Sequence, residues 1–373
     1  MKKVNIFVDC HVFDKGFQGT RTYIQGLYLE LIKEKDKNFY FAAVNVENLK
    51  SIFGNHDNVF YLKYSSDSAI FRLLLEIPYL IKKHNIEYAH FQYRVPPIKL
   101  CKYIVTTHDV LFEDYPEFFP KLNRIQSYYT YKFSAKISEI VFTVSEYSKR
   151  QIQKHLKIKD VIITPNGIES VFFEDYNKDE TQRKIQDEYG ISNYLIFISR
   201  WEPRKNHHLV LDAFNKLELY KSHFLVFVGD DTFKNNQYET IYQSLNYEVK
   251  QKIVILKRLS FEKMITLLRG SSVSIYPSIA EGFGIPPIES IAARIPTISS
   301  NTTAMSDFDF MNQYFFNPSD EKEFANTLQM VINQKDSNID NKIEIIKQRY
   351  NWKLSAAIFN KTLNKQKLTD SLP

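Results

Sequence analysis

The chain has little cysteine, little glycine and no long apolar run. Its 373 residues include only two cysteines, Cys10 and Cys101, and no C-x-x-C pair, so a disulfide framework and a paired-cysteine metal or redox centre are excluded. No apolar run approaches the ~20 residues that a membrane-spanning helix needs. The first residues, Met1 to Asp9, become polar too soon for a signal peptide and are typical of a buried strand. We expect a protein of the reducing cytoplasm.

Two further features narrow the class of protein. The fingerprint G-x-G-x-x-G of dinucleotide-binding folds is absent throughout, which weighs against a nicotinamide-dependent dehydrogenase. The net charge of +6 permits contact with anionic lipids or anionic substrates but does not require nucleic acid, and we expect no nucleic-acid partner.

Short apolar runs alternate with helical patterns along the whole chain, in two series. The predicted strands are residues 4–9, 39–44, 87–91, 103–107 and 140–144 in the first series and 194–199, 223–228, 252–256, 273–276 and 296–299 in the second. Such alternation is typical of α/β domains with parallel, doubly wound sheets, in which ligands bind beyond the carboxyl ends of the strands. We therefore predict two Rossmann-like domains, residues 1–168 and 169–351, that face each other across a cleft, with a helix at about 352–368 packing back on the first domain.

Two of the ten glycines lie in the segment 277–289, Pro-Ser-Ile-Ala-Glu-Gly-Phe-Gly-Ile-Pro-Pro-Ile-Glu. A glycine-poor chain is expected to keep glycine where the backbone turns sharply or approaches a ligand. An apolar run precedes the segment and Pro286-Pro287 suits a first helical turn, so the free amides of a helix N-terminus would face an anionic or hydroxyl-rich ligand. Glu281 then lies in the turn and Glu289 about one helical turn further on. The alternative is that Glu281 is a solvated loop charge and Glu289 only complements the helix dipole.

A basic loop follows the predicted strand 194–199. Arg200 offers a planar fork to phosphate oxygens and Lys205 a compact charge, so the two cations form a candidate diphosphate clamp; the alternative is a solvated loop. Asp307 and Asp309 form a D-x-D pattern, which some sugar-transferring folds use to bind a metal ion; because it lies in a polar loop, we interpret it here as no metal site. Because the two cations can neutralise a diphosphate, we expect no metal and no cofactor.

The first domain offers polar groups at the ends of two strands. The loop of residues 14–23 contains Gly16 and Gly19 and opens a helix whose amides suit a phosphate or a reacting group. His108 and Asp109 follow the strand 103–107, where they are either ligand contacts or structural residues.

Two segments, residues 70–83 and 121–133, are both basic and aromatic. Each is a candidate for contact with a membrane surface. The alternative for each is an ordinary core-facing helix with a solvated face.

Together these motifs resemble the retaining GT-B glycosyltransferases of family 4, within glycosyl transferases group 1, and the mannosyltransferases among them. The span from Glu281 to Glu289 is similar to the E-x7-E signature of that family. The resemblance extends over nearly the whole chain, through residues 107–109, 144–149, 165–168, 199–206, 228–229 and 299–301.

The resemblance implies roles for the donor-binding residues. Glu281 would contact the hydroxyls of the donor sugar, helped by the backbone amides of Phe283, Gly284 and Ile285. Glu289 would hold the nucleotide ribose, and the base would lie near residues 256–259.

The resemblance also implies roles around the reacting centre. Arg200 and Lys205 would bind the diphosphate and stabilise it as it leaves, and Gly19 would approach it from the first domain. His108 would face the reacting sugar, with Asp109 on the acceptor side.

This sequence departs from the family pattern in two places. Lys257 and Arg258 stand where the base-pocket strand usually ends in glycine, and the acidic residue usual shortly after residues 299–301 is missing unless Asp307 substitutes for it.

The implied function is transfer of a mannose-like hexose from a GDP- or UDP-sugar to a hydroxyl of a glycan or lipid-linked acceptor, with retention of configuration, in bacterial surface polysaccharide synthesis such as that of lipopolysaccharide. The expected location is the cytoplasm, with peripheral contact at the inner face of the membrane. Two other hypotheses stay open, a nucleotide-sugar epimerase of GT-B-like fold and a non-catalytic nucleotide-sugar-binding protein.

Overall fold

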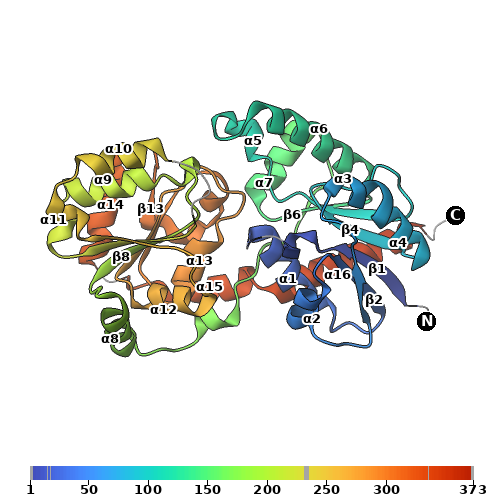
Figure 1. Cartoon of the computed structure of the whole chain (residues 1–373), viewed down its shortest axis with the longest axis horizontal. Helices are drawn as coiled ribbons and strands as arrows, with labels where there is room; N and C mark the ends of the chain where they lie inside the picture. The colour runs from blue at the N-terminus through green and yellow to red at the C-terminus, as the bar shows by residue number, and fades with distance from the viewer. Residues whose placement is uncertain (1–2, 15, 17, 231–234, 335, 371–373) are drawn as a thin grey trace. The chain divides into compact units, whose positions relative to one another are not determined.

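In the computed structural model the chain folds into two compact units. The structure describes residues 3–14, 16, 18–230, 235–334 and 336–370, so Lys15 and Phe17 of the predicted glycine loop lie outside the described residues. The N-terminal unit comprises Met1–Gly167 and Tyr350–Pro373, and the C-terminal unit comprises Ile168–Arg349. Each unit is built on one β-sheet with helices packed around it (Figure 1).

The N-terminal unit contains a seven-stranded parallel sheet in the order β3-β2-β1-β4-β5-β6-β7. Its strands are β1 (Val4–Asp9), β2 (Lys37–Ala43), β3 (Val59–Lys63), β4 (Tyr88–Gln92), β5 (Lys102–Thr106), β6 (Ile140–Thr143) and β7 (Ile162–Ile163). Its helices are η1 (His11–Asp14), α1 (Gly19–Leu31), α2 (Val46–Phe53), α3 (Ala69–Phe71), η2 (Arg72–Glu76), α4 (Ile77–Lys83), α5 (Leu111–Asp114), η3 (Pro116–Phe118), α6 (Lys121–Ile137), α7 (Glu146–Gln151), η4 (Ile152–Leu156) and α16 (Trp352–Asp370).

Aromatic packing fixes α1 and α16 on one face of this sheet. Tyr28 of α1 and Phe359 of α16 lie 6.2 Å apart between ring centroids, and both rings contact His90 of β4. Gly26 of α1 leaves room for Trp352 at the start of α16, because a Cβ at Gly26 would overlap the indole ring. The core of the opposite face combines strand residues with residues of α4, α6 and η4: Phe7, Phe91, Val105, Val141, Ile77, Ile81, Ala135, Ile152 and Leu156.

The C-terminal unit contains a six-stranded parallel sheet in the order β10-β9-β8-β11-β12-β13. Its strands are β8 (Tyr194–Ile198), β9 (Phe224–Val228), β10 (Ile253–Leu256), β11 (Val273–Tyr276), β12 (Thr297–Ser300) and β13 (Phe315–Phe316). Its helices are η5 (Ser170–Phe173), α8 (Lys178–Tyr189), η6 (Pro203–Lys205), α9 (His207–Lys216), η7 (Leu219–Lys221), α10 (Asn236–Ser244), α11 (Tyr247–Lys250), α12 (Phe261–Gly270), α13 (Ile285–Ala292), η8 (Thr303–Asp307), η9 (Asp309–Tyr314), α14 (Glu321–Asn333) and α15 (Ile339–Arg349).

The two sheets share one topological feature, a reversal of strand order beside the first strand. The reversal lies between β1 and β4 in the N-terminal unit and between β8 and β11 in the C-terminal unit. The prediction of two doubly wound parallel sheets is confirmed, although β3, β7 and β13 were not predicted. Ligands of such sheets bind outside the carboxyl ends of the strands at this switch point. None of the described helices is both long and apolar enough to span a bilayer.

Candidate functional site

Two loops bring five charged side chains together at the switch point of the C-terminal sheet. Glu281, on the loop after β11, accepts hydrogen bonds from Arg204 Nη1 at 2.9 Å and from Lys205 Nζ, both from the loop after β8. Glu202 links Arg204 to a third cation, Arg200. Its Oε2 lies 2.6 Å from Arg204 Nη2, and its Oε1 lies 2.6 Å from Arg200 Nη2. The result is an ion-pair chain, Arg200–Glu202–Arg204–Glu281–Lys205, whose three cations exceed its two carboxylates by one charge.

Burial differs along the ion-pair chain. The side chains of Lys205 and Glu281 are 12% and 14% exposed, whereas that of Arg200 is 47% exposed. Burial raises the pKa of Glu281, but Lys205 and Arg204 together lower it by more, to about 2. For Lys205 burial outweighs the attraction of Glu281, so the pKa of that amine lies below its usual range. Arg200 is therefore the most exposed of the three cations in the ion-pair chain.

The backbone around Glu281 is held by hydroxyl groups at the end of β12 and shortly after it. Ser300 Oγ donates to the carbonyl of Ser278 at 2.6 Å, and the amide of Glu281 donates to Thr303 Oγ1 at 2.9 Å. Thr303 has φ of 54°, which is rare for a β-branched residue. Such strain persists where the surrounding structure holds it, and it often accompanies function. Thr303 thus positions the backbone that carries the Glu281 carboxylate.

The turn after Glu281 leads directly into α13. Gly284 has φ of 89°, and a Cβ at this position would lie 2.8 Å from Met305 Cγ, so both backbone and space require glycine. Pro286 lies in the first turn of α13, as predicted. Phe283, Gly284 and Ile285 therefore carry the backbone into a helix N-terminus, which favours anions.

Glu289 lies in the second turn of α13. Burial, and to a smaller extent the Glu169 carboxylate, raises the pKa of Glu289 to about 8. Burial also raises the pKa of Glu169. At neutral pH the Glu289 side chain is therefore mostly a neutral acid, which can both donate and accept hydrogen bonds.

In the N-terminal unit, polar residues meet at the carboxyl ends of β4 and β5. His108 Nε2 lies 2.5 Å from Gln92 Oε1, which assigns the proton to Nε2 and makes Nδ1 the acceptor. Burial lowers the pKa of His108 to about 3, so the imidazole is neutral. The rings of Tyr23 and Tyr93 lie 5.0 and 5.3 Å from that of His108. Asp109 accepts from the Tyr93 hydroxyl at 3.4 Å.

Gly19 is the first residue of α1. No described atom outside its chain neighbours and its own helix backbone lies within 4 Å of the position that its Cβ would take. Packing within the described part of the unit therefore gives no reason for glycine there, in contrast to Gly284.

Two other predicted features lie in the C-terminal unit, and the D-x-D pattern spans the end of η8 (Asp307) and the start of η9 (Asp309) instead of the predicted loop. Asp309 of the D-x-D pattern pairs with Arg349 at 2.6 Å, and no group of three or more His, Cys, Asp or Glu is placed to hold a metal ion within the described residues. After β10, Arg258 adopts φ of 54° and its amide donates to Asp230 Oδ1 at 2.9 Å. The loops after β9 and β10 are thus tied together beside the region proposed for the base.

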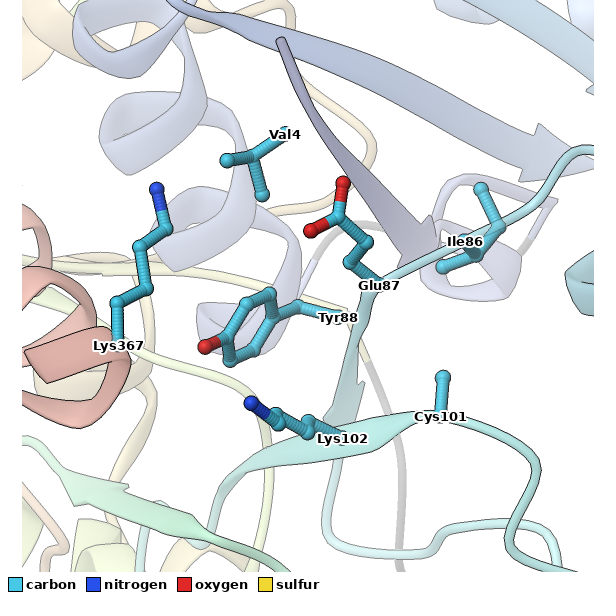
Figure 2. A pocket seen from close by; sticks show the side chains of 7 residues that line it. All are labelled: Val4, Ile86, Glu87, Tyr88, Cys101, Lys102 and Lys367. Atoms are coloured by element: carbon cyan, nitrogen blue, oxygen red, sulfur yellow. The ribbon is translucent and has the colours of Figure 1, made fainter. Parts of the chain in front are cut away.

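A separate pocket of about 570 Å³ lies at the amino ends of the strands of the N-terminal sheet, opposite the end that carries His108 (Figure 2). Its walls come from the first residues of β1, β4 and β5 and from Lys367 of α16, with the ring of Tyr88 between Lys102 and Lys367. Because these are the amino ends of the strands, the pocket is remote from the switch point.

Comparison with known families decides the class of protein. Residues 178–366 match the family described as "Glycosyl transferases group 1", and residues 19–171 match "Glycosyltransferase Family 4". The chain belongs to glycosyl transferases group 1. The resemblance stated from the motifs is therefore confirmed, and the chain is a glycosyltransferase.

Individual relatives agree with this assignment. This glycosyltransferase is 28% identical over 264 residues to the O-antigen chain mannosyltransferase RfbU of Salmonella typhimurium. The match covers 70% of this chain and 69% of RfbU. It is 21% identical over 368 residues to the serotype-specific mannosyltransferase WbdA of Escherichia coli, covering 92% of this chain but only 44% of WbdA. The structure of Anabaena HepE in complex with UDP-glucose superposes with a TM-score of 0.71 at 15% identity and covers 97% of this chain and 99% of HepE. The fold is GT-B.

Sequence reasoning missed two residues of the ion-pair chain and one residue that holds the backbone of Glu281. Glu202 and Arg204 connect Arg200 to Glu281, and Thr303 holds the Glu281 backbone. A signal for the first two existed in the charge pattern Arg-x-Glu-x-Arg-Lys over residues 200–205. No comparable signal marks Thr303.

Proposed function

We propose that this glycosyltransferase moves a mannose-like hexose, with retention of configuration, from a nucleotide-diphosphate sugar to a hydroxyl of a glycan or lipid-linked acceptor in bacterial surface polysaccharide synthesis. The names of RfbU and WbdA support mannose and a surface polysaccharide. The UDP-glucose complex of HepE supports a nucleotide-sugar donor. The observation that carries the proposal is the ion-pair chain that holds Glu281 between Lys205 and Arg204 at a switch point.

In this proposal the cations of the ion-pair chain serve the leaving group. Sugar transfer passes through an oxocarbenium-like state while negative charge grows on the departing diphosphate. Arg200 and Lys205 bind that diphosphate, and fixed charges aimed at a developing charge are a strong catalytic lever. They supply positive charge without a metal ion, so we propose a metal-independent reaction whose rate is unchanged by a chelator.

The carboxylates are assigned to binding. Glu281 accepts from the hydroxyls of the donor sugar beside the amides of residues 283–285, and Glu289 holds the ribose of a GDP- or UDP-sugar whose base lies near residues 256–259. With a pKa of about 2 and two cationic partners, Glu281 is a weak base and a poor nucleophile. We therefore infer same-face attack by the acceptor hydroxyl, with the departing phosphate accepting its proton.

The N-terminal unit is assigned to the acceptor and the reacting sugar. Neutral His108 can accept a hydrogen bond from a sugar hydroxyl through Nδ1. Asp109, the next residue in the chain, is assigned to the acceptor side. The open surroundings of Gly19 suit approach of a phosphate to the start of α1.

The basic helices of the N-terminal unit support peripheral contact with the inner face of the cell membrane. Helix α6 carries four basic residues and no acidic one, and Leu122 at its start is 81% exposed. Such helices bind anionic bilayers by combining apolar insertion with charge attraction. In this proposal the protein works in the cytoplasm.

The direct test is transfer from GDP-mannose and from UDP-hexoses to lipid-linked and free glycan acceptors. We expect Glu281→Ala and Lys205→Ala each to lower turnover by about a hundredfold or more, while Glu188→Ala, which removes an exposed ion pair with Lys263, leaves it unchanged. The anomeric configuration of the product, read by NMR, tests retention. Wild-type rates in both site variants, or binding of nicotinamide dinucleotides alone, would overturn the proposal.

A further inference from the structure

The loop that leads from β1 to α1 (Figure 1) contains a buried carboxylate paired with an imidazole. Asp9 is the last residue of β1, and His11 is the first residue of η1. His11 Nδ1 lies 3.0 Å from Asp9 Oδ2, and the two side chains are 19% and 2% exposed. Because β1 flanks the reversal of strand order in the N-terminal sheet, this Asp9–His11 dyad lies at the end of the sheet where ligands bind in such folds.

Asp9 is held as an anion by groups outside this loop. Tyr64, directly after β3, donates its hydroxyl to Asp9 Oδ1 at 3.0 Å, and Arg72 Nε of η2 lies 3.5 Å from Asp9 Oδ2. Burial raises the pKa of Asp9, but His11 and Arg72 together lower it by more, so that the pKa lies well below its usual range. Since Arg72 already balances the negative charge, Asp9 does not require a positive charge on the imidazole of His11.

The ionised carboxylate determines which nitrogen of His11 accepts hydrogen bonds. A carboxylate beside one ring nitrogen favours a proton there and leaves the other nitrogen as the acceptor of the neutral ring. In His11 the proton is therefore assigned to Nδ1, and Nε2 is the acceptor. Nε2 has no hydrogen-bond or ion-pair partner among the described residues, and part of the side chain is open to solvent.

Three other histidines of the N-terminal unit lack this combination. His90 is fully buried and hydrogen-bonds through both ring nitrogens, and Nε2 of the buried His108 bonds Gln92. His155 lies between two carboxylates, 2.8 Å from one and 3.8 Å from the other. His11 differs from them because a buried anion fixes one of its nitrogens while the other is available to a ligand.

We propose that His11 Nε2 accepts a hydrogen bond from a hydroxyl of the acceptor glycan, and that Asp9 is the positioning residue that keeps the imidazole proton on Nδ1. In the proposed reaction the attacking hydroxyl gives its proton to the departing phosphate, so His11 holds a neighbouring hydroxyl of the same sugar. His11 is then a specificity-determining residue, because a site built to bond a hydroxyl discriminates against ligands that lack it. Naming this ligand as the acceptor rests on the proposed function, whereas binding of a sugar hydroxyl by the dyad does not.

Two amide variants of His11 test the position of the accepting atom. The side-chain amide of glutamine reaches about as far as Nε2, whereas that of asparagine reaches only about as far as Nδ1. We expect His11→Asn to lower kcat/KM for the acceptor about tenfold and to leave the KM for the donor unchanged, because one hydrogen bond to the acceptor is lost. His11→Gln should stay within about threefold of the wild type, because its amide oxygen can accept the same bond.

His56→Asn is the matched control, since His56 is exposed and precedes β3 at the other end of the sheet. This variant should keep the wild-type kcat/KM. Equal values for His11→Asn and His11→Gln overturn the inference, because a residue that only pairs with Asp9 through Nδ1 would tolerate asparagine at least as well as glutamine. A loss in His56→Asn as large as that in His11→Asn also overturns it.

Nitrogen NMR of the full chain labelled at histidine reports the tautomer directly, and His11→Gln identifies the resonances of His11. We expect a proton on Nδ1 in the wild type. Methyl α-mannopyranoside, the probe for a sugar hydroxyl, should shift the Nε2 resonance of His11 but not that of His56. A proton on Nε2, or no shift of the His11 resonance with the probe, overturns the inference.

Failure of this inference can be told apart from failure of the proposed function. A protein that shows the shift and transfers no sugar to any acceptor overturns the proposed function alone. A protein that transfers sugar, but shows neither the shift nor a difference between His11→Asn and His11→Gln, overturns the role of the dyad alone.

Discussion

Replacing Glu281 with glutamine is expected to destabilise the C-terminal unit by about 3 kcal/mol at neutral pH. The pKa of Glu281 lies at about 2 instead of the ordinary 4.5, and each pKa unit corresponds to about 1.4 kcal/mol of preference for the ionised form in the folded state. Glutamine keeps the size of the side chain and loses the charge that pairs with Lys205 and Arg204.

The pH dependence of this effect has a defined sign. The folded-state pKa is lower than the unfolded one, so the stabilisation is fully present above pH 4.5 and is lost as the pH falls toward 2. The difference in unfolding free energy between wild type and Glu281→Gln should therefore be largest near neutral pH and should shrink below pH 4.5.

The two tryptophans of the chain make the measurement specific. Trp201 lies in the C-terminal unit and Trp352 in the N-terminal unit, so in a Trp352→Phe background the fluorescence of Trp201 follows urea unfolding of the unit that carries Glu281. Glu188→Gln, which breaks an exposed ion pair, is the matched control. If Glu281→Gln unfolds at the same urea concentration as that control at pH 7, or if its effect does not change with pH, the ion-pair chain does not stabilise the unit and the reasoning is refuted.

Two further predictions concern the same unit. Thr303→Val removes the acceptor of the Glu281 amide at nearly constant size and should lower kcat/KM for the donor about tenfold, since a lost buried hydrogen bond costs about 1–3 kcal/mol. Thr303→Ser should restore kcat/KM, and equal values for the two variants would exclude the positioning role. Because the pKa of Glu289 is about 8, nucleotide binding through its carboxylate should strengthen about tenfold between pH 7 and 9 in calorimetry, and Glu289→Gln should show no such rise.

The fold was largely predictable because strands of parallel sheets are buried on both faces and form short apolar runs. The strands that were missed have identifiable reasons. The ladders of β7 (Ile162–Ile163) and β13 (Phe315–Phe316) are only two residues long, too short for any periodicity. Strand β3, Val-Phe-Tyr-Leu-Lys, lies at the edge of its sheet and ends in a charge, so its pattern is weak.

The site was predictable in part. The sequence placed Glu281 and Lys205 in loops at strand ends, and the structure brings them into contact. The sequence did not reveal that Arg204 also pairs with the Glu281 carboxylate. Arg204 and Glu281 are 77 residues apart in sequence, and which of the neighbouring cations reaches Glu281 depends on side-chain geometry. The left-handed backbone of Thr303 was equally out of reach, since threonine is among the residues least expected at positive φ.

The two ends of the ion-pair chain differ in burial and in the number of partners. At one end Lys205 and Glu281 are largely buried, and the ion pair between them stabilises the folded state. At the other end Arg200 is nearly half exposed and holds a single carboxylate, Glu202, which Arg204 also neutralises. Moving Arg200 toward a diphosphate therefore leaves Glu202 paired, whereas moving Lys205 leaves Glu281 to Arg204 alone. In the proposed reaction, a diphosphate that binds both cations must offset the cost of moving Lys205 but not a comparable cost for Arg200. We therefore propose that the exposed Arg200 captures the ligand and that the buried Lys205 meets the charge that develops as the sugar leaves.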